Sequence, residues 1–173
     1  MVAITVTDAL DSPESIRFAR DLRASLKLRG IESTLLFPPV SQIVVDYNSV
    51  EAKNSPFIKE FDSIVSKLSY HIDIRSFDPT ESGPGTGSLD FIVANAPDVT
   101  DEGLNDSIIG HLNDFSEVDD KTIDYSSMYC STYAKLVLDV SSICILLNTE
   151  SVDLFLAAAD EIAEVIEQTY RVE

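Results

Sequence analysis

The chain has no tryptophan and few of the residues that metal and redox sites use, with two cysteines and two histidines among 173 residues. Neither His71 nor His111 has a second histidine or a cysteine at chelating spacing, so spacing alone predicts no metal site. Cys130 and Cys144 stand in apolar surroundings without ligand spacing, which favours buried free thiols in a reducing compartment. The expected location is therefore the cytoplasm, and a virus particle stays open as an alternative.

Long apolar runs are absent as well. The longest is the length of a strand, so no segment is expected to insert into a membrane. The first seven residues lack a basic stretch and do not resemble a signal peptide.

Basic residues are scarce: 12 of them face 30 acidic residues, and the formal net charge is −18. This balance argues against nucleic acid as a partner. The basic side chains are also unevenly placed, because five fall within one predicted helix: Arg17, Arg20, Arg23, Lys27 and Arg29. We expect the surface formed by Arg17, Arg20, Arg23 and Lys27 to meet a protein partner or another copy of the chain. The alternative is that the acids simply keep the protein soluble.

Strand-like and helix-like patterns alternate along the chain, which predicts one three-layer α/β domain over 1–173. Its central sheet is expected to be mostly parallel or mixed and to be flanked by helices. The glycine-rich loop at 78–88 is an excursion within this domain, and it lacks the lysine and the following helix of a phosphate-binding loop. The predicted strands cover 2–7, 31–37, 41–47, 70–77, 89–94, 121–125 and 142–148, and the predicted helices cover 13–29, 51–68, 101–115, 128–140 and 151–170.

The strand at 70–77 carries the most informative polar residues. His71, Asp73 and Arg75 alternate with apolar neighbours and so share one face of the strand. Charged side chains are rare inside sheets unless they are paired. We therefore expect Asp73 and Arg75 to form or border a polar site, or to satisfy each other.

Other polar residues follow the predicted strands. Asp46 and Asn48 end the strand at 41–47, and Asn148 ends a later one. Ligands of open α/β sheets bind beyond the carboxyl ends of the strands, so these residues are expected to converge with Asp73 and Arg75 if their strands are neighbours. His71 and His111 would join them only if the fold brings them together.

Four segments in the same order resemble motifs of the N-formylglutamate amidohydrolase family. They are Val44-Val45-Asp46-Tyr47-Asn48-Ser49, Ile72-Asp73-Ile74-Arg75-Ser76-Phe77, Leu89-Asp90-Phe91-Ile92-Val93 and Cys144-Ile145-Leu146-Leu147-Asn148. The resemblance implies an α/β fold related to the zinc-dependent exopeptidases, in which a metal-activated water attacks an amide. It also implies that an arginine helps to hold the substrate carboxylate.

The chain departs from this family at the positions that carry the chemistry. Arg75 stands where the family has a histidine, Ser49 where it has an arginine, and Leu146 or Leu147 where it has a late glutamate. Residues 1–30 contain no histidine that could belong to the family's first metal motif. A guanidinium cannot ligate zinc, so the resemblance implies that Arg75 occupies the empty metal position and pairs with Asp73 or Asp46.

Three functions follow as expectations. The leading one is a non-catalytic protein without a metal or cofactor that serves as a binding or structural component of a larger assembly, either a cellular complex or a virus particle. The second is a hydrolase of N-acyl amino acids or related amides whose altered site uses Asp46, His71, Asp73 and Arg75, with His111 as a further candidate. Zinc is the cofactor expected for this alternative. The third is a binder of a small carboxylate or phosphate that uses Arg75, Asn48 and Asn148.

Overall fold

The computed structural model describes residues 1–39, 54–64, 67–79, 88–96, 98–122 and 129–170. Within them the chain forms six strands and five α-helices in alternation, as its sequence pattern predicted. The strands are β1 (Val2–Val6), β2 (Ser33–Leu36), β3 (Tyr70–Phe77), β4 (Phe91–Asn95), β5 (Val118–Thr122) and β6 (Ser141–Asn148). The helices are α1 (Pro13–Leu28), α2 (Pro56–Ile64), α3 (Glu102–Leu112), α4 (Tyr129–Leu136) and α5 (Phe155–Tyr170), the last preceded by a short 3-10 turn at Val152–Leu154.

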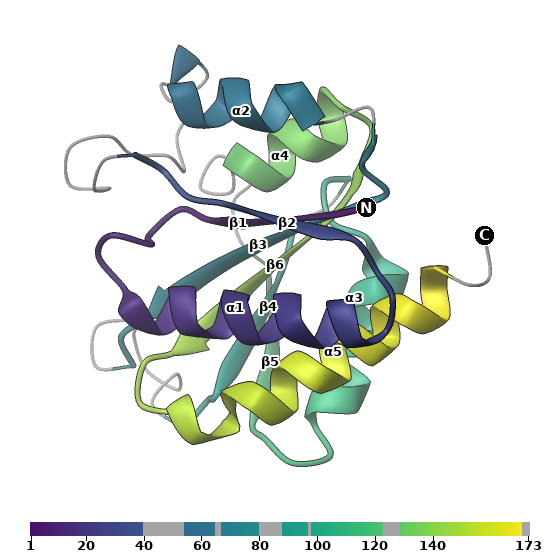
Figure 1. The fold of residues 1–173 in the computed structure, drawn as a ribbon. Helices are drawn as coiled ribbons and strands as arrows, with labels where there is room; N and C mark the ends of the chain where they lie inside the picture. Colours follow the sequence, from purple (N-terminus) through teal and green to yellow (C-terminus); the bar gives the residue numbers. More distant parts are fainter. Residues whose placement is uncertain (40–53, 65–66, 80–87, 97, 123–128, 171–173) are drawn as a thin grey trace.

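The strands form one mixed, mostly parallel sheet in the order β2-β1-β3-β6-β4-β5. Neighbouring strands run parallel except β4 and β6, which are antiparallel. Helices α1, α3 and α5 cover one face of the sheet and α2 and α4 cover the other, which gives three layers (Figure 1). The predicted fold class is confirmed.

Some predicted boundaries differ from the observed ones. β5 begins at Val118, three residues before the predicted start, because Asp119 and Asp120 interrupt the apolar alternation in a strand at the edge of the sheet. The predicted strand at 41–47 lies outside the described residues. No described helix has both the length and the apolar character needed to cross a membrane.

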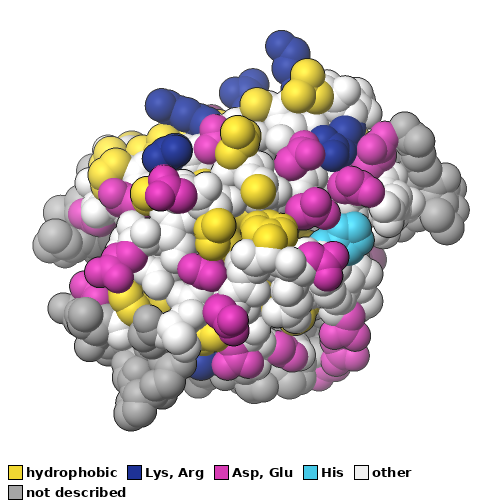
Figure 2. All heavy atoms as spheres, turned by 90° about the horizontal axis from the view of Figure 1, so that it is seen from below, with side chains coloured by type: hydrophobic (Ala, Val, Ile, Leu, Met, Phe, Trp, Pro, Cys, Tyr) yellow, Lys and Arg dark blue, Asp and Glu magenta, His cyan; other side chains and the backbone are white. Residues whose placement is uncertain are grey.

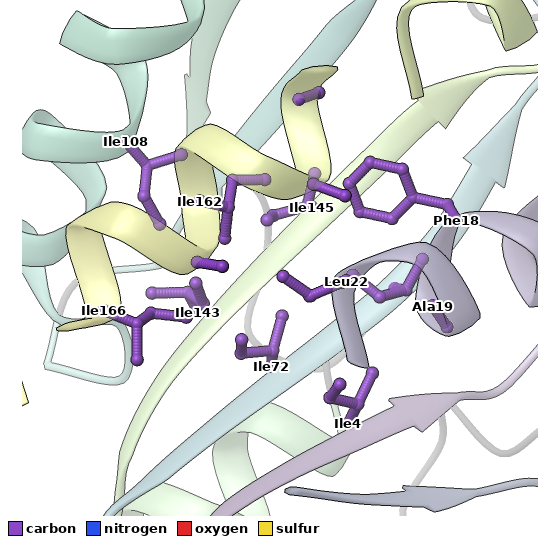
Figure 3. Close-up of a cluster of buried hydrophobic side chains, with 14 of the residues drawn as sticks. Ile4, Phe18, Ala19, Leu22, Ile72, Ile108, Ile143, Ile145, Ile162 and Ile166 are labelled. Carbon is purple, nitrogen blue, oxygen red and sulfur yellow. The ribbon is translucent and has the colours of Figure 1, made fainter. Parts of the chain in front are cut away.

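Alternation along the strands divides the core into two main clusters, beside a minor one formed by Ala94, Ala96, Val99 and Cys144. The larger cluster lies between the sheet and the layer of α1, α3 and α5, where isoleucines of β1, β3, β6, α3 and α5 meet Phe18 and Leu22 of α1 (Figure 3). Phe18 also contacts the rings of Phe91 and Phe155, at centroid distances of 6.3 and 5.4 Å. The smaller cluster lies beneath α2 and α4 and consists of Ala3, Leu36, Phe57, Ile58, Phe61, Cys130 and Ala134.

The ends of α1 follow directly from local sequence. The Ser12 side chain caps the helix by accepting a hydrogen bond from the backbone N–H of Ser15 at 3.3 Å, and Pro13 takes the first helical position. Gly30, with φ of 76°, adopts the left-handed conformation that ends the helix. The predicted start at residue 13 therefore matches the observed one, and the predicted end at residue 29 lies one residue past Leu28, at the C-cap.

Replacement of Ser12 by alanine is expected to lower the free energy of unfolding by about 1 kcal/mol, because it removes the acceptor for an N–H at the helix start. Urea denaturation followed by circular dichroism measures this change. Ser107→Ala is the matched control, since that exposed hydroxyl donates only to the carbonyl of Gly103 within α3. The cap is unimportant if both variants lose the same stability.

Candidate functional site

His71, Asp73 and Arg75 lie on the face of β3 that α2 and α4 cover. Alternation sends Ile72 and Ile74 to the larger core on the opposite face. The parallel register places Thr5 of β1 opposite Asp73 and Ser142 of β6 opposite His71. The three candidates are therefore joined by polar side chains from both neighbouring strands.

These five side chains form a continuous hydrogen-bonded chain, which we call the buried polar row: Ser142, His71, Thr5, Asp73 and Arg75. Ser142 Oγ lies 2.8 Å from His71 Nδ1, and His71 Nε2 lies 2.9 Å from Thr5 Oγ1. Thr5 Oγ1 donates to Asp73 Oδ1 at 2.7 Å, and Arg75 Nε donates to Asp73 Oδ2 at 2.8 Å. The row thus crosses three adjacent strands.

Proton counting fixes the direction of the bonds in the row. The single hydroxyl proton of Thr5 goes to Asp73, so the oxygen of Thr5 must accept from His71 Nε2. Neutral His71 then carries its proton on Nε2, and its Nδ1 accepts from the hydroxyl of Ser142. Both ring nitrogens are engaged, and neither is left to act as a base or as a metal ligand.

Burial keeps His71 neutral. Its side chain is fully inaccessible, and the ring of Phe61 in α2 packs over it at a centroid distance of 4.9 Å. Burial lowers the pKa of His71 to about 4; the nearby Asp73 opposes this decrease and Arg75 adds to it. The imidazole is therefore uncharged at neutral pH.

Asp73 and Arg75 form a buried ion pair at the other end of the row. Arg75 Nη2 lies 2.6 Å from Asp73 Oδ2; the Asp73 side chain is fully buried and that of Arg75 is 12% exposed. Burial alone would lower the pKa of Arg75, but the attraction of Asp73 raises it above its ordinary value. The Arg75 guanidinium therefore stays charged beside the Asp73 side chain.

The two cysteines border this face as free, buried thiols, as predicted. Cys144 lies opposite Asp73 in β6, with its Sγ 3.9 Å from Asp73 Oδ2. Burial raises the pKa of Cys144 to about 12 and raises that of Cys130 well above its ordinary value. Neither thiol becomes the thiolate that nucleophilic or metal-binding cysteines require.

The residues of this face do not fit a zinc site. Within the described part of the chain, no three His, Cys, Asp or Glu side chains are grouped so that they could hold a metal ion. Both oxygens of Asp73 and both nitrogens of His71 already have protein partners. The Arg75 guanidinium also places a fixed positive charge beside the carboxylate that would have to bind the metal.

The structure does not bring the remaining candidates to the row. Asn148 donates to the carbonyl of Leu89 at 2.8 Å and accepts from the N–H of Glu150 at 2.9 Å, so it organises loops at the end of β6. His111 lies in α3 on the opposite side of the sheet, where its Nδ1 is 2.8 Å from Glu161 Oε2 of α5. Asp46 and Asn48 lie outside the described residues.

Sequence reasoning missed Asp8, a buried carboxylate just after β1. Its Oδ2 accepts from the N–H and the hydroxyl of Ser76, both at 2.7 Å, and from Ser15 Oγ at 3.1 Å. Burial raises the pKa of Asp8, while its hydrogen bonds with Ser76 and Ser15 oppose the increase. The rule that selected Asn148, a polar residue at a strand's carboxyl end, applies equally to Asp8.

No family model matches the sequence, and no curated protein matches it. Solved structures match over nearly the whole chain. N-formylglutamate amidohydrolase from Ralstonia eutropha has a TM-score of 0.65 and 11% identity, covering 98% of this chain and 94% of that one. A bacteriophage poly-gamma-glutamate hydrolase has a TM-score of 0.64 and 10% identity, covering 99% and 86%. A metallo-carboxypeptidase from Burkholderia cenocepacia has a TM-score of 0.61 and 14% identity, covering 98% and 57%.

At these identities the likeness concerns the fold. The chain has the α/β fold of N-formylglutamate amidohydrolase, poly-gamma-glutamate hydrolase and metallo-carboxypeptidase.

Proposed function

We propose that this protein is a non-catalytic form of the amidohydrolase fold and acts as a binding or structural component of a larger assembly. One observation carries the proposal: Asp73 is fully buried and has both carboxylate oxygens held, one by Thr5 and the other by Arg75. A carboxylate in this state has a structural role, because it is closed to water and each of its oxygens is already bonded to a protein donor.

The rest of the buried polar row supports the same proposal. Metal-assisted amide hydrolysis needs neutral imidazole or carboxylate ligands around an open position for water. His71 has Ser142 and Thr5 as partners and Phe61 over its ring, so its environment is that of a satisfied core histidine. The charged end of the row is compensated internally by Arg75.

The metal content of the purified protein tests this proposal. We expect untagged protein that has been equilibrated with zinc and then dialysed to contain far less than one zinc per chain by elemental analysis. We also expect zinc to leave the thermal unfolding temperature unchanged, since a metal that binds only the native state would raise it.

Zinc retained at one ion per chain, together with a raised unfolding temperature, would contradict the proposal. N-formylglutamate and N-acetyl amino acids would then be the first substrates to assay. Arg75→Ala separates the two remaining alternatives. An altered hydrolase would lose turnover in this variant, whereas a carboxylate binder would lose stabilisation by dicarboxylates without ever showing turnover.

A further inference from the structure

One row of basic side chains on α1 has no partner within the described protein. Arg17, Arg20, Arg23 and Lys27 are exposed and make no hydrogen bond or ion pair with a described residue. This is unexpected in a chain with 30 acidic residues and 12 basic ones. Figure 2 shows acidic side chains scattered across the face seen from below, with most of its Lys and Arg side chains in the upper part of the view.

The next basic residue, Arg29 at the C-cap of α1, behaves differently. Arg29 Nη1 lies 2.6 Å from Asp160 Oδ1, and its other nitrogens lie 3.8 Å from Glu164 and 3.5 Å from Glu167, all on α5. Acidic side chains of α5 therefore neutralise Arg29. The four residues of the exposed row lie beyond these contacts and form no ion pair with an acidic side chain among the described residues.

The row borders a groove between α1 and β2. Its volume is about 480 Å³, and its lining residues are Arg20, Arg23, Ala24, Lys27, Leu35 and Phe37. Leu35 and Phe37 are half-buried against the larger core, so the groove has an apolar side and a basic side. Two smaller hollows adjoin this groove. One of about 300 Å³ shares Arg20 with it, and the other, of about 250 Å³, shares Arg23 and Lys27.

The dimensions of the groove suit an extended peptide. Residues 17 to 27 of a helix span roughly 15 Å, which is the length of about five residues of extended chain. Alternate side chains of an extended peptide point to opposite sides. One set would reach the guanidinium and ammonium groups of α1, and the other would rest on Leu35 and Phe37.

Charge distinguishes this occupant from a second copy of the chain. Two molecules that each carry a net charge of −18 repel each other at long range. A short flexible segment with a few carboxylates experiences little of that repulsion and still gains the local attraction of the three basic side chains that line the groove.

We propose that the groove between α1 and β2 binds an extended segment of a partner protein in which acidic and apolar side chains alternate. The inference rests on the proposed function, since it gives the binding component a surface and a partner chemistry.

Fluorescence anisotropy with a labelled Glu-Leu-Glu-Leu-Glu-Leu-Glu peptide tests the proposal. We expect saturable binding that weakens about tenfold when NaCl is raised from about 50 to about 300 mM, because salt screens exposed charges. A block peptide with four Glu followed by three Leu has the same composition and is expected to bind more weakly.

The decisive variant reverses three charges of the groove: Arg20→Glu, Arg23→Glu and Lys27→Glu. It is expected to weaken binding at least about tenfold, because carboxylates would then face carboxylates. The matched control, Lys59→Glu, Lys67→Glu and Lys121→Glu, makes the same change in net charge away from the groove and is expected to bind like the unaltered protein. Circular dichroism checks that both variants are folded. If the triple variant does not fold, the double variant Arg20→Gln with Arg23→Gln replaces it.

Absence of peptide binding, or binding that survives the triple reversal, would overturn the proposal. Light scattering measures whether the protein is a dimer. If it is, and if the triple reversal dissociates the dimer, the occupant of the groove is a second copy of the chain and the proposal is overturned. None of these results depends on zinc content, so a failure of the groove proposal is distinguishable from a failure of the proposed function.

Discussion

Replacement of Asp73 by alanine is expected to lower the free energy of unfolding by about 3–5 kcal/mol, the typical cost of leaving a buried charge without its partner. Arg75, whose side chain is 12% exposed, would keep its positive charge and lose the carboxylate beside it. Thr5 would lose the acceptor of its hydroxyl proton in a fully buried position. Urea denaturation of the variant at pH 7 measures the loss.

A double variant separates the ion pair from its surroundings. Asp73→Asn with Arg75→Met retains an acceptor for Thr5 and removes both charges, so the destabilisation is expected to be less than about 2 kcal/mol. We expect a double-mutant cycle to give a large interaction free energy between positions 73 and 75. If Asp73→Ala costs no more than the double variant, the ion pair has no special role in stability.

Acidification is expected to destabilise the protein through His71. Its pKa is about 4 in the folded protein and about 6.5 in the unfolded chain. Between these values the unfolded chain binds more protons, so the free energy of unfolding decreases as the pH falls from about 6.5 to about 4. One pKa unit corresponds to about 1.36 kcal/mol, so the contribution of His71 amounts to about 3 kcal/mol.

The comparison of His71→Gln with the unaltered protein isolates this effect. Glutamine keeps polar atoms in the row but does not titrate, so the variant is expected to lose less stability between pH 7 and pH 4.5. Asp8 acts in the opposite direction, because its pKa is raised and its contribution to stability therefore decreases as the pH rises. Parallel pH profiles of the two proteins in urea denaturation would contradict the assignment to His71.

Features that depend on neighbouring residues were predicted well. The cap at Ser12, the proline after it and the stop at Gly30 each act within one helical turn, so sequence alone locates α1. The alternation of β3 likewise predicts that His71, Asp73 and Arg75 share a face. Nothing in the sequence of β3 says which helices cover that face, and the structure shows that they are α2 and α4.

Features that depend on strand pairing were not predictable in the same way. Thr5 and Ser142 join the row only because β1 and β6 flank β3 in a particular register. Neither residue lies in a motif that marks it as polar core. The separation of His111 from His71 was not predictable either. The sequence of α3 identifies an acidic amphipathic helix but does not specify on which side of the sheet that helix packs.

The position of β6 has a consequence for how the chain is made. Of the six described strands, β6 is the last to leave the ribosome, and it is central in the sheet, between β3 and β4. Until Ser141–Asn148 has been synthesised, β2-β1-β3 and β4-β5 have no strand to join them, and each presents an open edge. Final assembly of the sheet therefore waits for nearly the whole described chain, and a nascent chain stalled before β6 is exposed to edge-to-edge aggregation.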